Sequence, residues 1–146
     1  MRHALEYIAT ICAIVFAGAA LYINLVEHPA RMGLETRVAA LQWAPSYKRA
    51  TWMQAPLALV SLAAGVGAWL MGAGLGWLVA ALFIGAVVPI TFIVIMPTNH
   101  KLLAPGRDLA SPDTRALLEH WGNLHAIRTS LSLFSSGLYL WLSLVA

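Results

Sequence analysis

Residues 52–96, WMQAPLALVSLAAGVGAWLMGAGLGWLVAALFIGAVVPITFIVIM, decide the fold of this chain. They contain two apolar runs, at about residues 52–71 and 75–96, without a single charged side chain. A helix of about 20 residues, rising about 1.5 Å per residue, is about 30 Å long and matches the hydrocarbon core of a bilayer. Only Gly72, Ala73 and Gly74 separate the runs. The stretch therefore predicts a tight hairpin of two membrane-spanning helices.

Two further apolar segments, at about residues 8–26 and 124–145, lie on either side of this hairpin. Glu6 and the length of the first segment argue against a cleaved signal peptide, so we expect a retained spanning helix. Hydrophobic residues make up 60% of the 146 residues, more apolar surface than a soluble domain of this size could bury. We therefore predict an all-α integral membrane four-helix bundle, with residues 1–146 as a single transmembrane domain.

The polar connection at residues 27–50 suggests a helix of its own. Leu34, Val38 and Leu41 recur at helical spacing among charged residues, which predicts a short amphipathic helix at the membrane interface. Pro45 favours a new helix start at that point.

The second polar connection, at residues 97–123, contains a clear helix start. Ser111 is a good N-cap, Pro112 suits the first turn, and Asp113 favours the positive end of the helix dipole. The fourth helix is therefore expected to begin near Pro112, outside the membrane.

The distribution of basic residues predicts the topology. With four spans, both long connections lie on one side, and the termini and the hairpin lie on the other. The first side carries Arg31, Arg37, Lys48, Arg49, Lys101, Arg107 and Arg115, and the second carries Arg2. The positive-inside rule then puts the termini outside and the long loops in the cytoplasm. We expect the membrane to be a bacterial inner membrane.

Polar side chains within the apolar segments mark a candidate site, because ionisable groups in a bilayer are costly. Those that share helix faces gather towards the long connections: Asn24, His28, Tyr47, Gln54, Asn99, Trp121, His125 and Arg128. If the faces meet, they form a polar pocket with an aromatic rim. The alternative is an interfacial aromatic belt of Trp43, Tyr47, Trp52 and Trp121, with Arg and His reaching head groups and Glu27 and Arg31 forming a surface ion pair.

Several other functions find no support in the sequence. The basic residues are not clustered as in a nucleic-acid-binding protein, so no nucleic-acid partner is expected. Cys12 is the only cysteine, which excludes a redox mechanism with paired cysteines. There is no phosphate-binding loop or HExxH motif, and no histidine pair has i, i+4 spacing, so no metal site is predicted. Binding of haem or a metal between His28 and His125 stays open.

Five segments of the chain form recognisable motifs: Pro89-Ile90-Thr91-Phe92, Met96-Pro97-Thr98-Asn99 with Leu102, Trp121-Gly122-Asn123-Leu124-His125-Ala126-Ile127-Arg128-Thr129, Glu27-His28-Pro29-Ala30-Arg31, and residues 43–49. Together they resemble a family of small four-helix membrane proteins named anthrone oxygenases or grouped as a domain of unknown function. The resemblance covers nearly the whole chain. For the fungal polyketide members it implies oxygen-dependent conversion of an anthrone to an anthraquinone without an obvious cofactor.

The resemblance and the polar stripes together suggest roles for the candidate residues. His125 or His28 would remove a ring proton, and Arg128 would stabilise the developing oxyanion. Substrate binding is assigned to Asn99, Tyr47, Trp43, Trp121, Arg31, Asn24 and Gln54. The hypothesis is a membrane-embedded oxidoreductase acting on an aromatic or quinol-like lipophilic molecule.

Two alternatives remain beside this hypothesis. The first is a binding protein or subunit that holds a lipid, quinone or haem without chemistry. The second, a glutathione-dependent enzyme of the eicosanoid type, is disfavoured because its Glu-Arg-x-x-Arg-x-x-x-Asn pattern is absent. Membrane lipids are expected partners in every case. Small residues such as Ala63 and Gly67 allow close helix approach and leave a homo-oligomer open.

Overall fold

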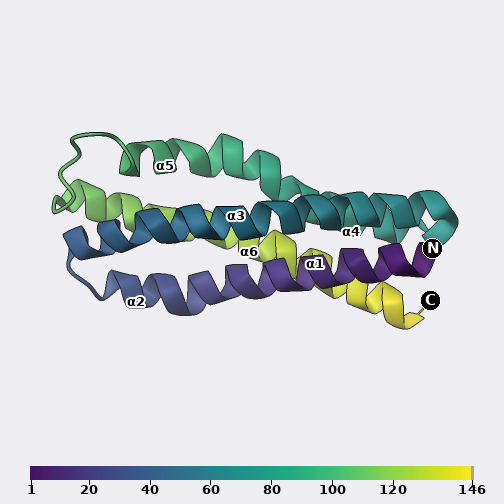
Figure 1. Ribbon diagram of the computed structural model, residues 1–146. Coiled ribbons are helices and arrows are strands. Elements are labelled where there is room, and N and C mark those ends of the chain that lie inside the picture. The colour runs from purple at the N-terminus through teal and green to yellow at the C-terminus, as the bar shows by residue number, and fades with distance from the viewer. Residues whose placement is uncertain (146) are drawn as a thin grey trace.

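The computed structural model describes residues 1–145 and consists of four long helices (Figure 1). The first runs from α1 (Arg2–Tyr22) through the π-helix η1 (Ile23–Glu27) into α2 (His28–Met32). The others are α3 (Thr36–Ala68) with η2 (Trp69–Ala73), α4 (Leu75–Ile90) with η3 (Thr91–Ile95) and α5 (Met96–Leu102), and α6 (Pro112–Val145). No strand occurs in the described part of the chain, which confirms the all-α prediction.

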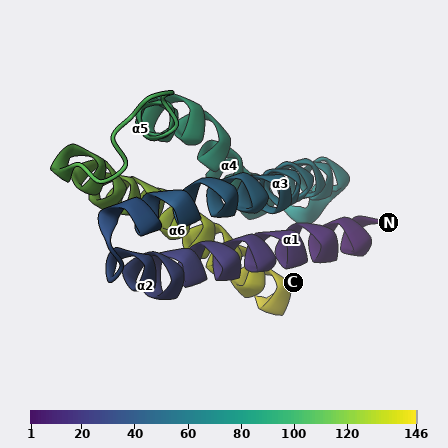
Figure 2. The ribbon, with the colours of Figure 1, turned by 60° about the vertical axis from the view of Figure 1, so that its left-hand side comes forward.

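The four helices form a bundle in which α1 and α4 each pack between α3 and α6. The two termini and the α3–α4 hairpin lie at one end (Figure 1). The other end holds α2, the start of α3, α5 and the start of α6, and Figure 2 shows α5 standing apart from α3 there. The long connections therefore share one end of the bundle, as expected.

Three of the helices are long and apolar enough to cross a bilayer: Arg2–Met32, Thr36–Ala73 and Leu75–Leu102. Each extends beyond the span predicted for it. The fourth, α6, is not among them, because serines recur through its apolar half at positions 130, 132, 135, 136 and 143 and lower the hydropathy. Its crossing over residues 124–145 therefore stays a prediction.

The predicted hairpin is present and depends on its glycines. Gly72 and Gly74 have φ values of 85° and 98°, a backbone conformation that residues with a Cβ rarely adopt. The chain can therefore reverse within three residues.

The first connection differs from the prediction. Residues after Thr36 are helical, but they are continuous with α3, which neither forms a separate amphipathic helix nor starts at Pro45. The reason is tertiary packing: Ala39, Ala40 and Trp43 are buried in a cluster with residues of α5 and α6. This burial outweighs the loss of one backbone hydrogen bond at Pro45.

Two of the π-helices precede prolines at the same distance. Pro29 follows η1 and Pro97 follows η3, each after one intervening residue. A helical proline has no N–H and clashes with the carbonyl four residues earlier, so the helix widens locally. These wide turns were not predicted from the sequence.

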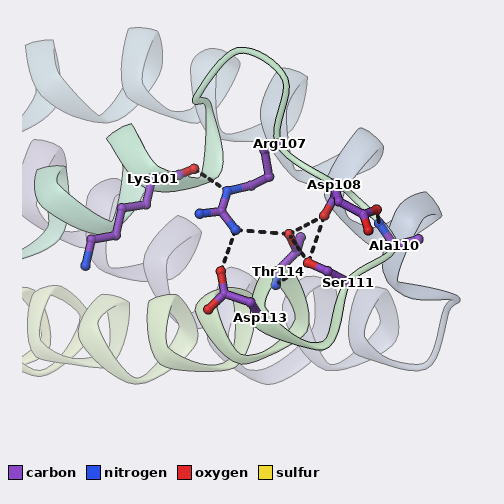
Figure 3. Close-up of polar contacts among 7 residues, drawn as sticks. All are labelled: Lys101, Arg107, Asp108, Ala110, Ser111, Asp113 and Thr114. Carbon is purple, nitrogen blue, oxygen red and sulfur yellow. Dashed lines mark hydrogen bonds and ion pairs between the residues drawn. The ribbon is translucent and has the colours of Figure 1, made fainter.

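The predicted start of α6 is confirmed: Ser111 Oγ accepts a hydrogen bond from the Thr114 backbone N–H at 3.2 Å. In the loop before α6, the Arg107 side chain forms hydrogen bonds to both ends of the loop (Figure 3). Its Nε donates to the Lys101 carbonyl at 2.6 Å and its Nη1 to Asp113 at 2.7 Å. The loop thus joins the end of α5 to the first turn of α6.

Candidate active site

One face of α6 supplies the centre of the candidate site. Trp121, His125 and Arg128 are spaced at four and three residues, and all three side chains are buried in the bundle. With residues of η1, α2 and α3 they line an internal cavity of about 10 Å³, close to the volume that one water molecule needs. Its lining is Ile23, Arg31, Ser46, Tyr47, Ala50, Thr51, Gln54, Trp121, His125 and Arg128.

His125 is held from the first helix. Its Nδ1 lies 2.8 Å from Asn24 Oδ1, and Asn24 Nδ2 donates to the Gly122 carbonyl at 3.0 Å. Thr129 Oγ1 donates to the same Asn24 oxygen at 2.5 Å. The imidazole is therefore held by a contact at Nδ1, and the residue also lines the cavity.

Arg128 brings a cation into the interior of the bundle. Its Nη2 donates to Gln54 Oε1 at 2.8 Å, and its guanidinium carbon lies 5.4 Å from the centre of the Phe16 ring. No acidic side chain among residues 1–145 pairs with it. Two donor atoms, Arg128 Nε and Gln54 Nε2, are buried and have no hydrogen-bond partner among residues 1–145. Such unpaired donors suit an oxyanion that reaches this position.

An apolar pocket of about 90 Å³ adjoins the cavity and shares Tyr47, Thr51 and Arg128 with it. It lies between α3 and the segment formed by α4, η3 and Met96. The rest of its lining is Phe16, Ala55, Ala58, Val87, Val88, Thr91, Phe92 and Met96. Thr51 and Phe92 are exposed, so the pocket opens on the side of the bundle. Arg128 is its only charged residue.

Arg31 is not part of a surface ion pair, contrary to that alternative. The residue is 3% exposed, and its Nη2 donates to Glu27 at 2.5 Å and to Ser46 at 3.2 Å. Its Nη1 donates to His28 Nδ1 at 3.1 Å, and its Nε to Gln42. Four of the five N–H groups of the guanidinium thus have partners that fix its orientation, and the residue also lines the cavity.

Aromatic side chains pack beside the cavity. The Trp121 ring centre lies 5.1 Å from that of His28 and 5.0 Å from that of His125. Trp43 stacks on Tyr47 at 5.2 Å. Trp43 and Trp121 are 1% and 4% exposed, so the interfacial belt is wrong for them, whereas Trp52, 76% exposed, fits it.

Four predicted site residues line neither cavity: Asn24, His28, Trp43 and Asn99. The first three contact residues that do, whereas Asn99 has no hydrogen bond to a predicted site residue among residues 1–145. It is fully buried on α5, but it lines neither cavity, and its Nδ2 lies 4.0 Å from Met96 Sδ. Tyr47 donates to the same sulfur at 3.8 Å, so Asn99 reaches the site only through Met96. Ser46, Gln42 and Phe16 were not predicted, because neither residue type nor spacing singles them out.

His28 and His125 do not share a metal or haem position in this arrangement. His28 Nδ1 accepts from Arg31, and a Cβ placed on Gly122 would lie 2.7 Å from His28 Nε2. Both ring nitrogens of His28 are thus covered. Over residues 1–145, no three His, Cys, Asp or Glu side chains are grouped to hold a metal ion.

Comparisons with known proteins agree with these features. A family model described as anthrone oxygenase matches residues 43–138, from Trp43 on α3 to the inner half of α6. The anthrone oxygenase tpcL of Aspergillus fumigatus is 36% identical over 68 residues, which are 44% of this chain and 42% of that protein. The chain thus matches less than half the length of this curated relative. No solved structure matches. The family model covers most of the chain and all of the cavity residues except Ile23 and Arg31, and the chain belongs to the anthrone oxygenase family.

Proposed function

We propose that this chain is a membrane-embedded oxygenase for a lipophilic aromatic compound of the anthrone or quinol type. One observation carries the proposal: Arg128 lines both the apolar pocket, which opens on the side of the bundle, and the adjoining cavity, which His125 also lines. A flat substrate would place its rings against Phe16 and Val87. Its oxygen would then reach Arg128, the only charged group in the pocket.

The pocket residues suit proton removal followed by reaction with dioxygen. His125 takes a proton from the activated CH₂ carbon through Nε2, and the ring system becomes an electron-rich anion. Arg128 and Gln54 stabilise its oxygen by donating hydrogen bonds. Dioxygen accepts two electrons from this anion and forms a hydroperoxide at the same carbon. Loss of water leaves a carbonyl, so each turnover consumes one O₂ and releases one H₂O.

The test compares the wild type with His125→Phe in nanodiscs, using anthrone and dissolved oxygen. We expect the variant to lose roughly 10²- to 10⁴-fold in rate, the usual contribution of a general base. Anthraquinone formation and oxygen uptake are both recorded and corrected for the protein-free reaction. His120→Phe is the matched control, because His120 lies exposed on the same helix. Equal rates for the wild type and His125→Phe would remove His125 from the mechanism.

A binding protein without catalysis is the second candidate, supported by the same apolar side opening. A protein of this kind retains a lipid or quinone through purification and shows no oxygen uptake. Native mass spectrometry of the purified protein distinguishes the two functions.

A further inference from the structure

Asn24 occupies a place in the hydrogen-bond network that the proposed function does not explain. It lies in η1, where its side chain reaches α6 and contacts three groups there. From its place on the polar face of the first helix, Asn24 was expected to bind substrate. It does not line the internal cavity and instead contacts Nδ1 of His125, which does.

The orientation of the Asn24 amide follows from its partners. The Gly122 carbonyl can only accept a hydrogen bond, so the Asn24 group that faces it at 3.0 Å must be the NH₂. The Asn24 oxygen therefore faces α6 at the other contact, where the Thr129 hydroxyl donates to it at 2.5 Å. The Gly122 carbonyl alone fixes the orientation of the amide, because a hydroxyl can either donate to the amide oxygen or accept from the NH₂.

This orientation determines where the proton of a neutral His125 lies. The Asn24 oxygen is 2.8 Å from His125 Nδ1 and can only accept, so Nδ1 carries the hydrogen. The lone pair then belongs to Nε2. None of the hydrogen bonds in the described part of the chain reaches that nitrogen.

We infer that Asn24 is a positioning residue that holds His125 in its Nδ1–H tautomer, with the basic Nε2 available to the cavity. The role of Nε2 as a catalytic base rests on the proposed function, whereas the tautomer itself follows from the hydrogen bonds alone. Free histidine in water prefers the opposite tautomer, so the contact with Asn24 has a measurable consequence. The Gly122 carbonyl acts with Asn24 by fixing the orientation of its amide.

The experiment is nitrogen-15 NMR of protein labelled at histidine, with the His125 signals assigned from the spectrum of His125→Phe. The expected wild-type spectrum has a protonated Nδ1 and a pyridine-like Nε2 on His125. Asn24→Leu removes the acceptor at similar volume, and we expect it to shift His125 towards the Nε2–H form. Asn24→Asp keeps an acceptor and should keep the Nδ1–H form. Asn123→Leu is the matched control, because Asn123 is an exposed asparagine on α6.

Activity provides a separate reading of the same variants. Asn24→Leu should lower kcat roughly 10- to 100-fold with little change in KM, since it weakens the base rather than binding. Asn24→Asp should retain most of the rate. A wild-type spectrum with a pyridine-like Nδ1 overturns the inference, even if Asn24→Leu does not fold. The predicted tautomer without any oxidation by the wild type would instead contradict the proposed function alone.

Discussion

Arg128 is a positive charge held where charge is costly. Its guanidinium lies against Phe16 and is buried inside an apolar helix bundle, and Gln54 is its one hydrogen-bonding side chain among residues 1–145. A buried charge without an acidic partner rarely contributes to stability, because its desolvation costs more than one neutral hydrogen bond returns. A residue of this kind is retained for what it binds.

We therefore predict opposite effects on stability and activity for Arg128→Met. The unfolding temperature in detergent should stay unchanged or rise, because an apolar side chain of similar length replaces the charge. The value of kcat/KM for anthrone should fall roughly 10²- to 10³-fold through loss of oxyanion stabilisation. Arg37→Met, at an exposed position of α3, should change neither quantity. A large drop in unfolding temperature for Arg128→Met would identify a structural role instead.

At the scale of elements, α2 and α6 approach each other at Gly122. A Cβ there would lie 2.6 Å from His28 Cδ2, well inside van der Waals contact. The His28 ring cannot move aside freely, because Arg31 binds its Nδ1 and Trp121 packs against it. This packing keeps η1, with Asn24, against α6.

Gly122→Ala should consequently destabilise the bundle by about 1–3 kcal/mol, the usual cost of overpacking. Gly18→Ala is the control: a Cβ on Gly18 meets nothing within 4 Å, so that variant should be neutral or slightly stabilising. Adding His28→Ala to Gly122→Ala should recover part of the loss, and a double-mutant cycle measures the coupling. Additive effects in that cycle would show that there is no steric conflict between the His28 side chain and a Cβ at position 122.

The helices and much of the site could be predicted because they follow helical periodicity. Tyr47, Thr51 and Gln54 on α3, and His125 with Arg128 on α6, lie on regular faces that meet. Asn99 lines neither cavity, and it follows the π-helix η3. Each residue of an α-helix turns by about 100°, so a wider turn after Thr91 changes the face that Asn99 occupies.

The environment of Arg31 could not be predicted, for a different reason. A spacing of four residues from Glu27 fits a surface ion pair as well as a buried one. Burial is decided by Gln42 and Ser46, which belong to another helix and carry no sequence signal of contact. The start of α3 was missed on similar grounds, since packing of Trp43 outweighs the local effect of Pro45.

At the scale of the whole molecule, charge is distributed unequally between the ends of the bundle. Arg31 is buried in a hydrogen-bond network, so it reports poorly on the side of the membrane. Without it, the end that carries the long connections still has Arg37, Lys48, Arg49, Lys101, Arg107 and Arg115, against Arg2 at the other end. This asymmetry favours long connections in the cytoplasm and termini outside, because basic segments resist translocation.

Two reporters in bacterial cells test this topology. Alkaline phosphatase fused after the C-terminus should be active, and green fluorescent protein fused there should be dark. Cys12→Ser with Pro105→Cys places one thiol in the exposed α5–α6 loop, and a membrane-impermeant maleimide should label it in spheroplasts only after permeabilisation. Labelling before permeabilisation, with a fluorescent C-terminal fusion, would invert the topology. In that case the basic residues of the long connections bind substrate or lipid head groups, and they do not determine the orientation of the protein in the membrane.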